Sequence, residues 1–233
     1  MRFCADMHTH TIVSAHALST IGEICAHAAK IGLKAVAITD HGPMTPDSPH
    51  LWYFSSIRGL PREVDGVYLL RGAEANVLDT YGSIDVPVAY DLDYVIASMH
   101  NDVYRPSTSA RHTETWLAIC DNPYVDCLGH TGQPDFPFDH EEVVKRCRDT
   151  NTLIEINNAS KYVRKGSWES CAKILRMCKK HETRIVVSSD AHNHWGVGNF
   201  SNSAELLDEV GFPEELVVNA DWERFKAYFG IEK

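Results

Sequence analysis

Long apolar runs are missing from this 233-residue sequence. No stretch approaches the roughly 20 apolar residues that a membrane-spanning helix needs, and the opening residues MRFCADMHTH lack the apolar core of a signal peptide. The seven cysteines form no C-x-x-C pair, and their odd number and wide scatter do not suit a disulfide framework. We therefore expect reduced, buried thiols in a cytoplasmic protein that has no membrane partner.

Basic residues are also scarce. The chain has 22 Lys and Arg against 32 Asp and Glu, and the resulting formal net charge of -10 opposes nonspecific binding to nucleic acid or to an anionic membrane. The sequence contains no G-x-G-x-x-G motif after its first apolar run, no low-complexity segment and no linker. We expect one domain over residues 1–233 that acts on a small molecule, and nothing in the sequence indicates an oligomeric state.

Short apolar runs alternate with stretches of helical periodicity. One such stretch, STIGEICAHAAKIG, has a capping box formed by Thr20 and Glu23 and a stop at Gly32. This alternation predicts a parallel sheet covered by helices, either open or closed into a barrel. The seven expected strands cover residues 3–7, 35–39, 67–73, 94–99, 125–129, 152–156 and 184–189; helices are also expected at 139–150, 166–181, 202–211 and 220–230, and surface loops at 42–49 and 104–113.

Histidines and carboxylates gather where the expected strands end. These residues are His8, His10, Asp40, His41, Glu74, His100, His130, Asp190 and His192. In a parallel barrel the carboxyl ends of all strands meet at one rim, which is where active sites are built. Residues i and i+2 of a strand point the same way, so His8 pairs with His10 and Asp190 with His192. The two pairs become neighbours only if the sheet closes, which favours a barrel.

Imidazole and carboxylate groups in such numbers indicate metal binding. They suit Zn²⁺, Mn²⁺ or Fe²⁺ better than Mg²⁺ or Ca²⁺, which prefer oxygen ligands, and they exceed the needs of one ion. An isolated histidine is more often a structural residue, and we apply that interpretation to His27, His50, His112, His140, His181 and His194. His16, alone in a loop, also looks structural on this basis.

The motifs DMHTHT, ITDHG, RGAEANV, MH at residues 99–100, GH at 129–130, EINN and SSDAH together resemble those of the PHP (polymerase and histidinol phosphatase) superfamily. The similarity is greatest to its small stand-alone trinuclear-zinc phosphatases of the YcdX type. It implies a distorted (β/α)7 TIM-like barrel and three zinc ions, with Mn or Fe as alternatives at some positions. The implied ligand sets are His8, His10, Glu74 and Asp190; Glu74 (bridging), His100 and His130; and His16, His41 and His192.

The implied activity is hydrolysis of a small phosphorylated substrate by a metal-bound hydroxide. A centre of several divalent cations attracts an anionic phosphate into an otherwise acidic protein and can activate water for in-line attack. Arg164 and Lys165, in a loop at the rim, are the expected phosphate contacts. Asp40 is expected to orient an imidazole or to cap the loop that follows it. Loops 42–59 and 101–113 are expected to decide which substrate is accepted.

Other activities remain alternatives at this point. Histidinol-phosphate phosphatase is the closest, although such proteins tend to be longer. A nuclease is disfavoured by the acidic charge balance, and an amidohydrolase by the absence of a lysine in IASMH, where that class commonly has a modified one. A metal-binding module without catalysis is disfavoured because so many histidines with only two bridging-type carboxylates should leave coordination positions open.

Overall fold

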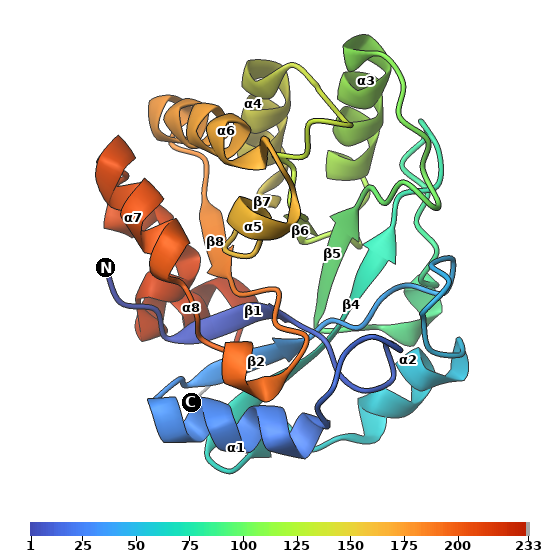
Figure 1. Ribbon diagram of the computed structural model, residues 1–233, viewed down its shortest axis with the longest axis vertical. Helices are drawn as coiled ribbons and strands as arrows, with labels where there is room; N and C mark the ends of the chain where they lie inside the picture. Colours follow the sequence, from blue (N-terminus) through green and yellow to red (C-terminus); the bar gives the residue numbers. More distant parts are fainter. Residues whose placement is uncertain (232–233) are drawn as a thin grey trace.

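Seven parallel strands form a nearly closed barrel with helices around its outside (Figure 1). The computed structural model describes residues 1–231. The strands follow one another around the barrel in the order β1 (Ala5–Thr9), β2 (Ala35–Ile38), β4 (Val67–Asn76), β5 (Tyr94–Ser98), β6 (Cys127–Leu128), β7 (Leu153–Asn157) and β8 (Ile185–Ser188). A short antiparallel strand, β3 (Glu63–Val64), pairs with the amino-terminal end of β4. This strand was not predicted.

The first and last strands meet at a seam that Asn219 bridges. Its side-chain amide donates hydrogen bonds to the carbonyl oxygens of Ala5 (2.8 Å) in β1 and Val187 (2.7 Å) in β8. Its side-chain oxygen accepts one from the Val187 amide at 3.0 Å. Nearer the rim, the His10 amide donates to the Ala191 carbonyl at 2.9 Å. These contacts confirm the predicted barrel over an open sheet.

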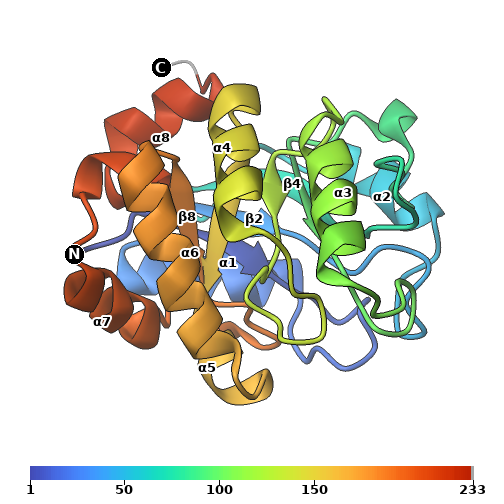
Figure 2. The ribbon, with the colours of Figure 1, turned by 90° about the horizontal axis from the view of Figure 1, so that it is seen from above.

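Helices form the outer layer, as Figures 1 and 2 show. They are α1 (Ile21–Ile31), α2 (Trp52–Ser56), α3 (Ser109–Cys120), α4 (His140–Thr150), α5 (Ser160–Val163), α6 (Ser167–His181), α7 (Ser201–Val210) and α8 (Trp222–Phe229). Short 3-10 turns occur at Ile57–Gly59, Val88–Tyr90, His194–Gly196, Glu214–Leu216 and Val218–Ala220. Among the described residues, no helix has both the length and the apolar character required to cross a membrane.

Local sequence explains most helix boundaries. The predicted capping box of α1 is present, with Thr20 and Glu23 bonded reciprocally, and the helix stops at Gly32, whose φ of 83° an L side chain adopts only with strain. Asp139 caps α4 and Asp221 caps α8 through the backbone amides three residues on. The helices predicted from residues 139, 166, 202 and 220 are therefore confirmed, within a residue or two at each end.

Two predicted boundaries differ from the structure by three or more residues. Residues 104–113 were expected to form a loop, but α3 begins at Ser109, capped by Thr108. This helix buries His112, Thr113 and Thr115, and these polar side chains on its inner face hide the apolar periodicity. The third predicted strand was expected to end at residue 73, whereas β4 continues to Asn76 because it remains paired with β5. Glu74 therefore lies inside a strand.

The barrel interior is apolar below the rim. Every parallel strand contributes to one buried cluster, and Phe225 of α8 packs against it; the strand members are Ala5, Met7, Ala35, Ala37, Leu70, Tyr94, Ile96, Cys127, Leu153 and Val186. In β4 every second residue faces inward, so Glu74 faces the same way as Leu70 and lies four residues closer to the carboxyl end of the strand. The apolar floor and the polar rim are thus successive layers of the same strands.

Candidate metal centre

Glu74 lies at the centre of the rim, and its two carboxylate oxygens face different imidazoles. Oε1 lies 2.7 Å from His130 Nε2 and 3.3 Å from His100 Nε2. Oε2 lies 3.2 Å from His41 Nε2 and 3.4 Å from His8 Nε2. A carboxylate in this position can contribute one oxygen to each of two metal sites.

The two carboxylate oxygens of Asp190 also face different partners. Its Oδ1 lies 3.2 Å from His10 Nε2 and 3.7 Å from His8 Nε2. Its Oδ2 accepts hydrogen bonds from Asn157 Nδ2 at 3.0 Å and from the Arg164 guanidinium at 3.2 Å. Asn157 and Arg164 thus hold one oxygen, and the other is directed to the imidazoles.

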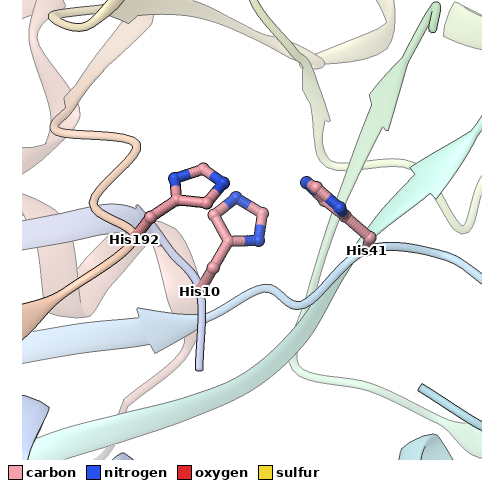
Figure 3. Close-up of side chains that lie close together, drawn as sticks. All are labelled: His10, His41 and His192. Carbon is pink, nitrogen blue, oxygen red and sulfur yellow. The ribbon is translucent and has the colours of Figure 1, made fainter. Parts of the chain in front are cut away.

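A third group is formed by His10, His41 and His192, whose rings converge on one space (Figure 3). The ring centroid of His10 lies 4.3 Å from that of His192 and 4.4 Å from that of His41. His16 stacks on the outer side of His192, with centroids 4.3 Å apart, and its side chain is 55% exposed.

The donor atoms fit metal ions. Four sets each have ligand atoms within 4.8 Å of one another: His8, His10 and Glu74; Glu74, His100 and His130; His10, His41 and His192; and His16, His41 and Asp47. The Nε2 atoms of His8, His10 and His192 are buried and have no hydrogen-bond partner in the part of the chain that the structure describes. A buried, unpaired imidazole nitrogen is costly unless a cation binds it.

These sets share members with the expected arrangement and differ from it in two parts. The implied first set includes Asp190, which belongs to none of the four sets. The sets around Glu74 contain members of the first two implied ligand sets. The implied third set joins His16 to His41 and His192, but the structure groups His10 with that pair and places His16 with His41 and Asp47. The difference in this third set arises because His16 Nδ1 faces Asp47 Oδ2 at 2.8 Å.

Polar side chains bind the second ring nitrogen of several imidazoles. Glu155 Oε1 lies 2.7 Å from His8 Nδ1, Asp47 Oδ2 lies 2.7 Å from His41 Nδ1, and Asn76 Oδ1 lies 2.7 Å from His100 Nδ1. Gln133 contacts His130 Nδ1. The oxygens of Glu155, Asp47 and Asn76 accept a hydrogen bond from Nδ1, which fixes the tautomer and leaves Nε2 free for a metal, whereas Gln133 presents its amide nitrogen to His130.

None of these four partners was among the predicted site residues. Only Glu155 carries a clear signal in the sequence, because a glutamate within the apolar strand TLIEIN must be buried and therefore paired.

Asp40 does not orient an imidazole, so that part of the expectation needs correction. Its carboxylate accepts hydrogen bonds from the Thr11 amide (2.7 Å), the Thr11 hydroxyl (2.9 Å), Ser14 Oγ (2.8 Å) and the Tyr53 hydroxyl (2.5 Å). These four donors occupy the carboxylate and fix the loop between His10 and His16. The other expectation, that Asp40 caps the loop that follows it, is not met either, because three of the four donors belong to the loop after β1.

Irregularities of the backbone set the direction of two of the imidazole side chains. The β1–β2 ladder pairs Asp6 with Val36 but Thr9 with Ile38, so β1 has one extra residue between these positions. Such a bulge re-aims side chains, and it lets both Met7 and His8 face inward. His130 has a φ of 28°, which is rare for a residue with a Cβ and turns the side chain out of strand alternation.

Electrostatics keep both central carboxyl groups ionised. Burial alone would raise the pKa of Glu74, but the charges of His8 and His100 and close contacts with His100 and His130 hold it well below its usual range. Burial likewise opposes ionisation of Asp190, and His8, His10 and Arg164 outweigh it, so its pKa is also lowered strongly.

The imidazoles divide into two classes. Burial, reinforced by the positive charge of Arg164, lowers the pKa of His130 to about 4, and burial also lowers the pKa of His10 well below its usual range. Burial acts in the same direction on His41, but contact with Glu74 and the charges of Glu74 and Asp47 raise its pKa to about 9. His10 and His130 are therefore neutral at pH 7, with a lone pair available for a metal.

A cavity of about 570 Å³ opens beside these residues. The predicted phosphate contact Arg164 lines it, together with His16, His41, Glu74, His100, Asp190 and His192. Lys165 is exposed and is not among the lining residues. The part of the site open to a ligand is thus the side that carries Arg164 and the loop after β8.

Comparison with known proteins places the chain in a family. The model of the PHP domain matches residues 6–159. A probable phosphatase from Clostridium botulinum is 45% identical over 230 residues, which cover 98% of this chain and 95% of that protein. A probable phosphatase from Acetivibrio thermocellus is 43% identical over 235 residues, covering 100% and 98%.

A similar fold occurs in the crystal structure of histidinol phosphate phosphatase from Lactococcus lactis, complexed with zinc, L-histidinol and phosphate. The TM-score is 0.67 at 18% identity, and the match covers 91% of this chain and 95% of the other. This likeness concerns the fold, whereas the family model and the relatives above 40% identity concern ancestry. The chain belongs to the PHP domain family.

Proposed function

We propose that this protein is a metal-dependent phosphatase that hydrolyses a small phosphorylated substrate at a three-zinc centre. The observation that carries the proposal is Glu74, whose two oxygens face two sets of imidazoles beside the Arg164 cavity. Relatives that match over nearly their whole length are described as probable phosphatases. The zinc and phosphate bound in the Lactococcus lactis structure agree with the donor set found here.

The proposed ligands form three sets that share residues. His8, His10, Glu74 and Asp190 would hold one ion, and Glu74, His100 and His130 a second. His41 and His192 would hold the third, with His16 completing the set, as the resemblance implies. Zinc suits these nitrogen and carboxylate donors, and Mn or Fe are alternatives at some positions. When bound, the ions supply Lewis acidity and a water of lowered pKa.

The residues of the chain then act on the substrate and on the ligands. Arg164 is positioned to contact a phosphoryl oxygen, because its guanidinium lies beside Asp190 and lines the cavity. Glu155 and Asp47 hold His8 and His41 in the tautomer that presents Nε2. In the reaction the oxygen of water bonds to phosphorus, the ester P–O bond breaks, and the leaving oxygen takes a proton, releasing an alcohol and inorganic phosphate.

The test is hydrolysis by protein stripped of metal and then reloaded. Stripped protein is expected to release no phosphate from a panel of phosphomonoesters, and zinc is expected to restore release. His10→Ala should not be restored, whereas His181→Gln should behave like wild type, because His181 contacts Glu141 at the far end of α6. Zinc rebinding without hydrolysis of any phosphoester would overturn the proposal and leave a metal-binding module.

The remaining expectations about partners stay predictions. We propose a cytoplasmic enzyme that does not act on nucleic acid, which the net charge of -10 supports. Faster degradation of single-stranded DNA than of small phosphomonoesters would contradict this.

A further inference from the structure

Two exposed apolar side chains form one wall of the cavity. Tyr162 and Val163 belong to α5, the short helix after β7, which projects beyond the neighbouring helices at the end of α6 (Figure 2). They are 72% and 67% exposed, and both line the cavity together with Ala159. Because these two adjacent apolar side chains line the cavity beside a polar centre, they offer a surface on which an apolar part of a bound ligand can pack.

The ring of Tyr162 is held in place. Its hydroxyl donates a hydrogen bond to Asn202 Oδ1 at 3.0 Å. Asn202 is only 4% exposed, and its backbone amide donates to Asn158 Oδ1 at 2.9 Å. The hydroxyl is thus fixed to the interior of the protein while most of the residue remains open to solvent. An aromatic ring ordered in advance loses little conformational entropy when a ligand stacks on it.

This wall adjoins the expected position of the phosphate. Arg164 follows Tyr162 by two residues, and its guanidinium lies 3.2 Å from Asp190 Oδ2. A phosphoryl group at Arg164 therefore places the next few atoms of the substrate, its leaving group, beside α5. Consecutive Cα atoms are about 3.8 Å apart, so the Cα atoms of Tyr162 and Arg164 lie within about 7.6 Å of each other, a span that a small phosphomonoester can bridge.

The chemistry of the wall restricts the leaving group. Among the described lining residues, acidic side chains other than Glu74 and Asp190 are absent, and those two face the imidazoles and Arg164. Apart from the imidazoles and Arg164, the other lining residues are uncharged: Ala159, Tyr162, Val163, Ser189, Ala191, Gly196 and three asparagines. A cationic amine would find no free carboxylate here, whereas an uncharged flat ring can stack on Tyr162.

We propose that Tyr162 and Val163 form a subsite for the leaving group of the substrate, and that it selects phosphomonoesters whose alcohol carries an uncharged aromatic or heteroaromatic ring. The inference rests on the proposed phosphatase function. It disfavours leaving groups that are cationic amines, and it disfavours small polyols, which offer no ring to stack.

The experiment compares kcat/KM for 2-phenylethyl phosphate and glycerol 3-phosphate with the zinc-loaded enzyme. Both are esters of primary alcohols, so the comparison isolates recognition of the ring. Wild type should prefer the phenyl ester. Tyr162→Leu should lower kcat/KM for that ester by about tenfold and change glycerol phosphate by less than about twofold. Tyr162→Phe keeps the ring but loses the hydrogen bond to Asn202. Its kcat/KM for the phenyl ester should lie between those of wild type and Tyr162→Leu.

Direct binding and a control variant complete the test. The Kd of 2-phenylethyl phosphonate should weaken by about tenfold in Tyr162→Leu at unchanged zinc content. The control variant is Tyr124→Leu, at a tyrosine that is half exposed and lines a different cavity. It should change kcat/KM for neither ester. Equal effects of Tyr162→Leu on both esters, or none, would overturn the subsite. Histidinol phosphate as the preferred substrate would also overturn it, while hydrolysis of no phosphoester at all would instead refute the proposed function.

Discussion

Glu155 Oε1 lies 2.7 Å from His8 Nδ1, and both side chains are fully shielded from solvent. Burial opposes the charge of Glu155, but the charge of His8 and its hydrogen bond outweigh this and lower the Glu155 pKa. The pair fixes the His8 ring so that Nε2 faces Glu74 and Asp190. One buried carboxylate therefore orients an imidazole whose other nitrogen, Nε2, is proposed to bind a metal.

Glu155→Gln should weaken zinc binding by about tenfold to 100-fold, because a neutral amide holds the His8 tautomer less firmly. The measurement is zinc retained by the variant against a competing chelator. Glu141→Gln is the matched control, since Glu141 makes a similar contact with His181 (2.9 Å) at the surface. Equal retention by both variants would show that Glu155 has only a structural role.

His16→Ala should lose one metal ion and most activity while the barrel stays folded. His16 is more than half exposed, so its removal leaves no large cavity and should change the free energy of unfolding of the metal-free protein by less than about 0.5 kcal/mol. Elemental analysis together with a denaturant titration checks both parts. Retention of all the metal would mean that His16 is only a loop residue.

Zinc binding should weaken as the pH falls. In the metal-free protein the pKa of His41 is raised to about 9, so His41 is protonated at neutral pH and must release that proton to bind an ion. The protonated form stabilises the metal-free protein fully below pH 6.5, and this stabilisation is lost as the pH rises through about 9. Zinc affinity should therefore fall by up to about tenfold for each unit below pH 9. Calorimetry between pH 6.5 and 9 measures it, and affinity independent of pH would contradict the assignment of His41.

Asn219→Ala should destabilise the barrel by about 3 kcal/mol, because it removes three buried hydrogen bonds at the seam and leaves the Ala5 and Val187 carbonyl oxygens without this donor. Chemical denaturation of metal-free protein measures the change. Asn101→Ala, which removes an exposed hydrogen bond to Asp135, should cost much less. Similar stability of the two variants would show that Asn219 does not hold the seam.

Strand periodicity was enough to predict the fold and part of the site. Glu74 and His41 continue the inward-facing series of their strands, from Leu70 in β4 and from Ala37 in β2. This alternation alone places both residues at the carboxyl-end rim of a barrel. Asp190 and His192 do come together with His8 and His10, but not for the expected reason. β8 ends at Ser188, and Asp190 has a φ of 58° outside the strand.

The rest of the site depends on features that no single-sequence pattern encodes. The bulge in β1 appears only as a shift in pairing between Asp6 and Thr9, and the φ of His130 only as a backbone angle. Asp47 lies in the loop after β2, six residues beyond His41, so its contact with two imidazoles depends on the path of that loop. Polar partners supplied by loops are set by tertiary structure, which explains why Asp47 and Gln133 were missed.

The metal content of the purified protein tests the central claim most directly. Elemental analysis of protein prepared without chelator should give about three zinc equivalents per chain, with manganese or iron replacing some of them. Glu74→Gln should lose at least two equivalents, because Glu74 faces two of the proposed sites. A content near one ion per chain, with no loss on changing Glu74, would contradict the shared centre proposed for this rim.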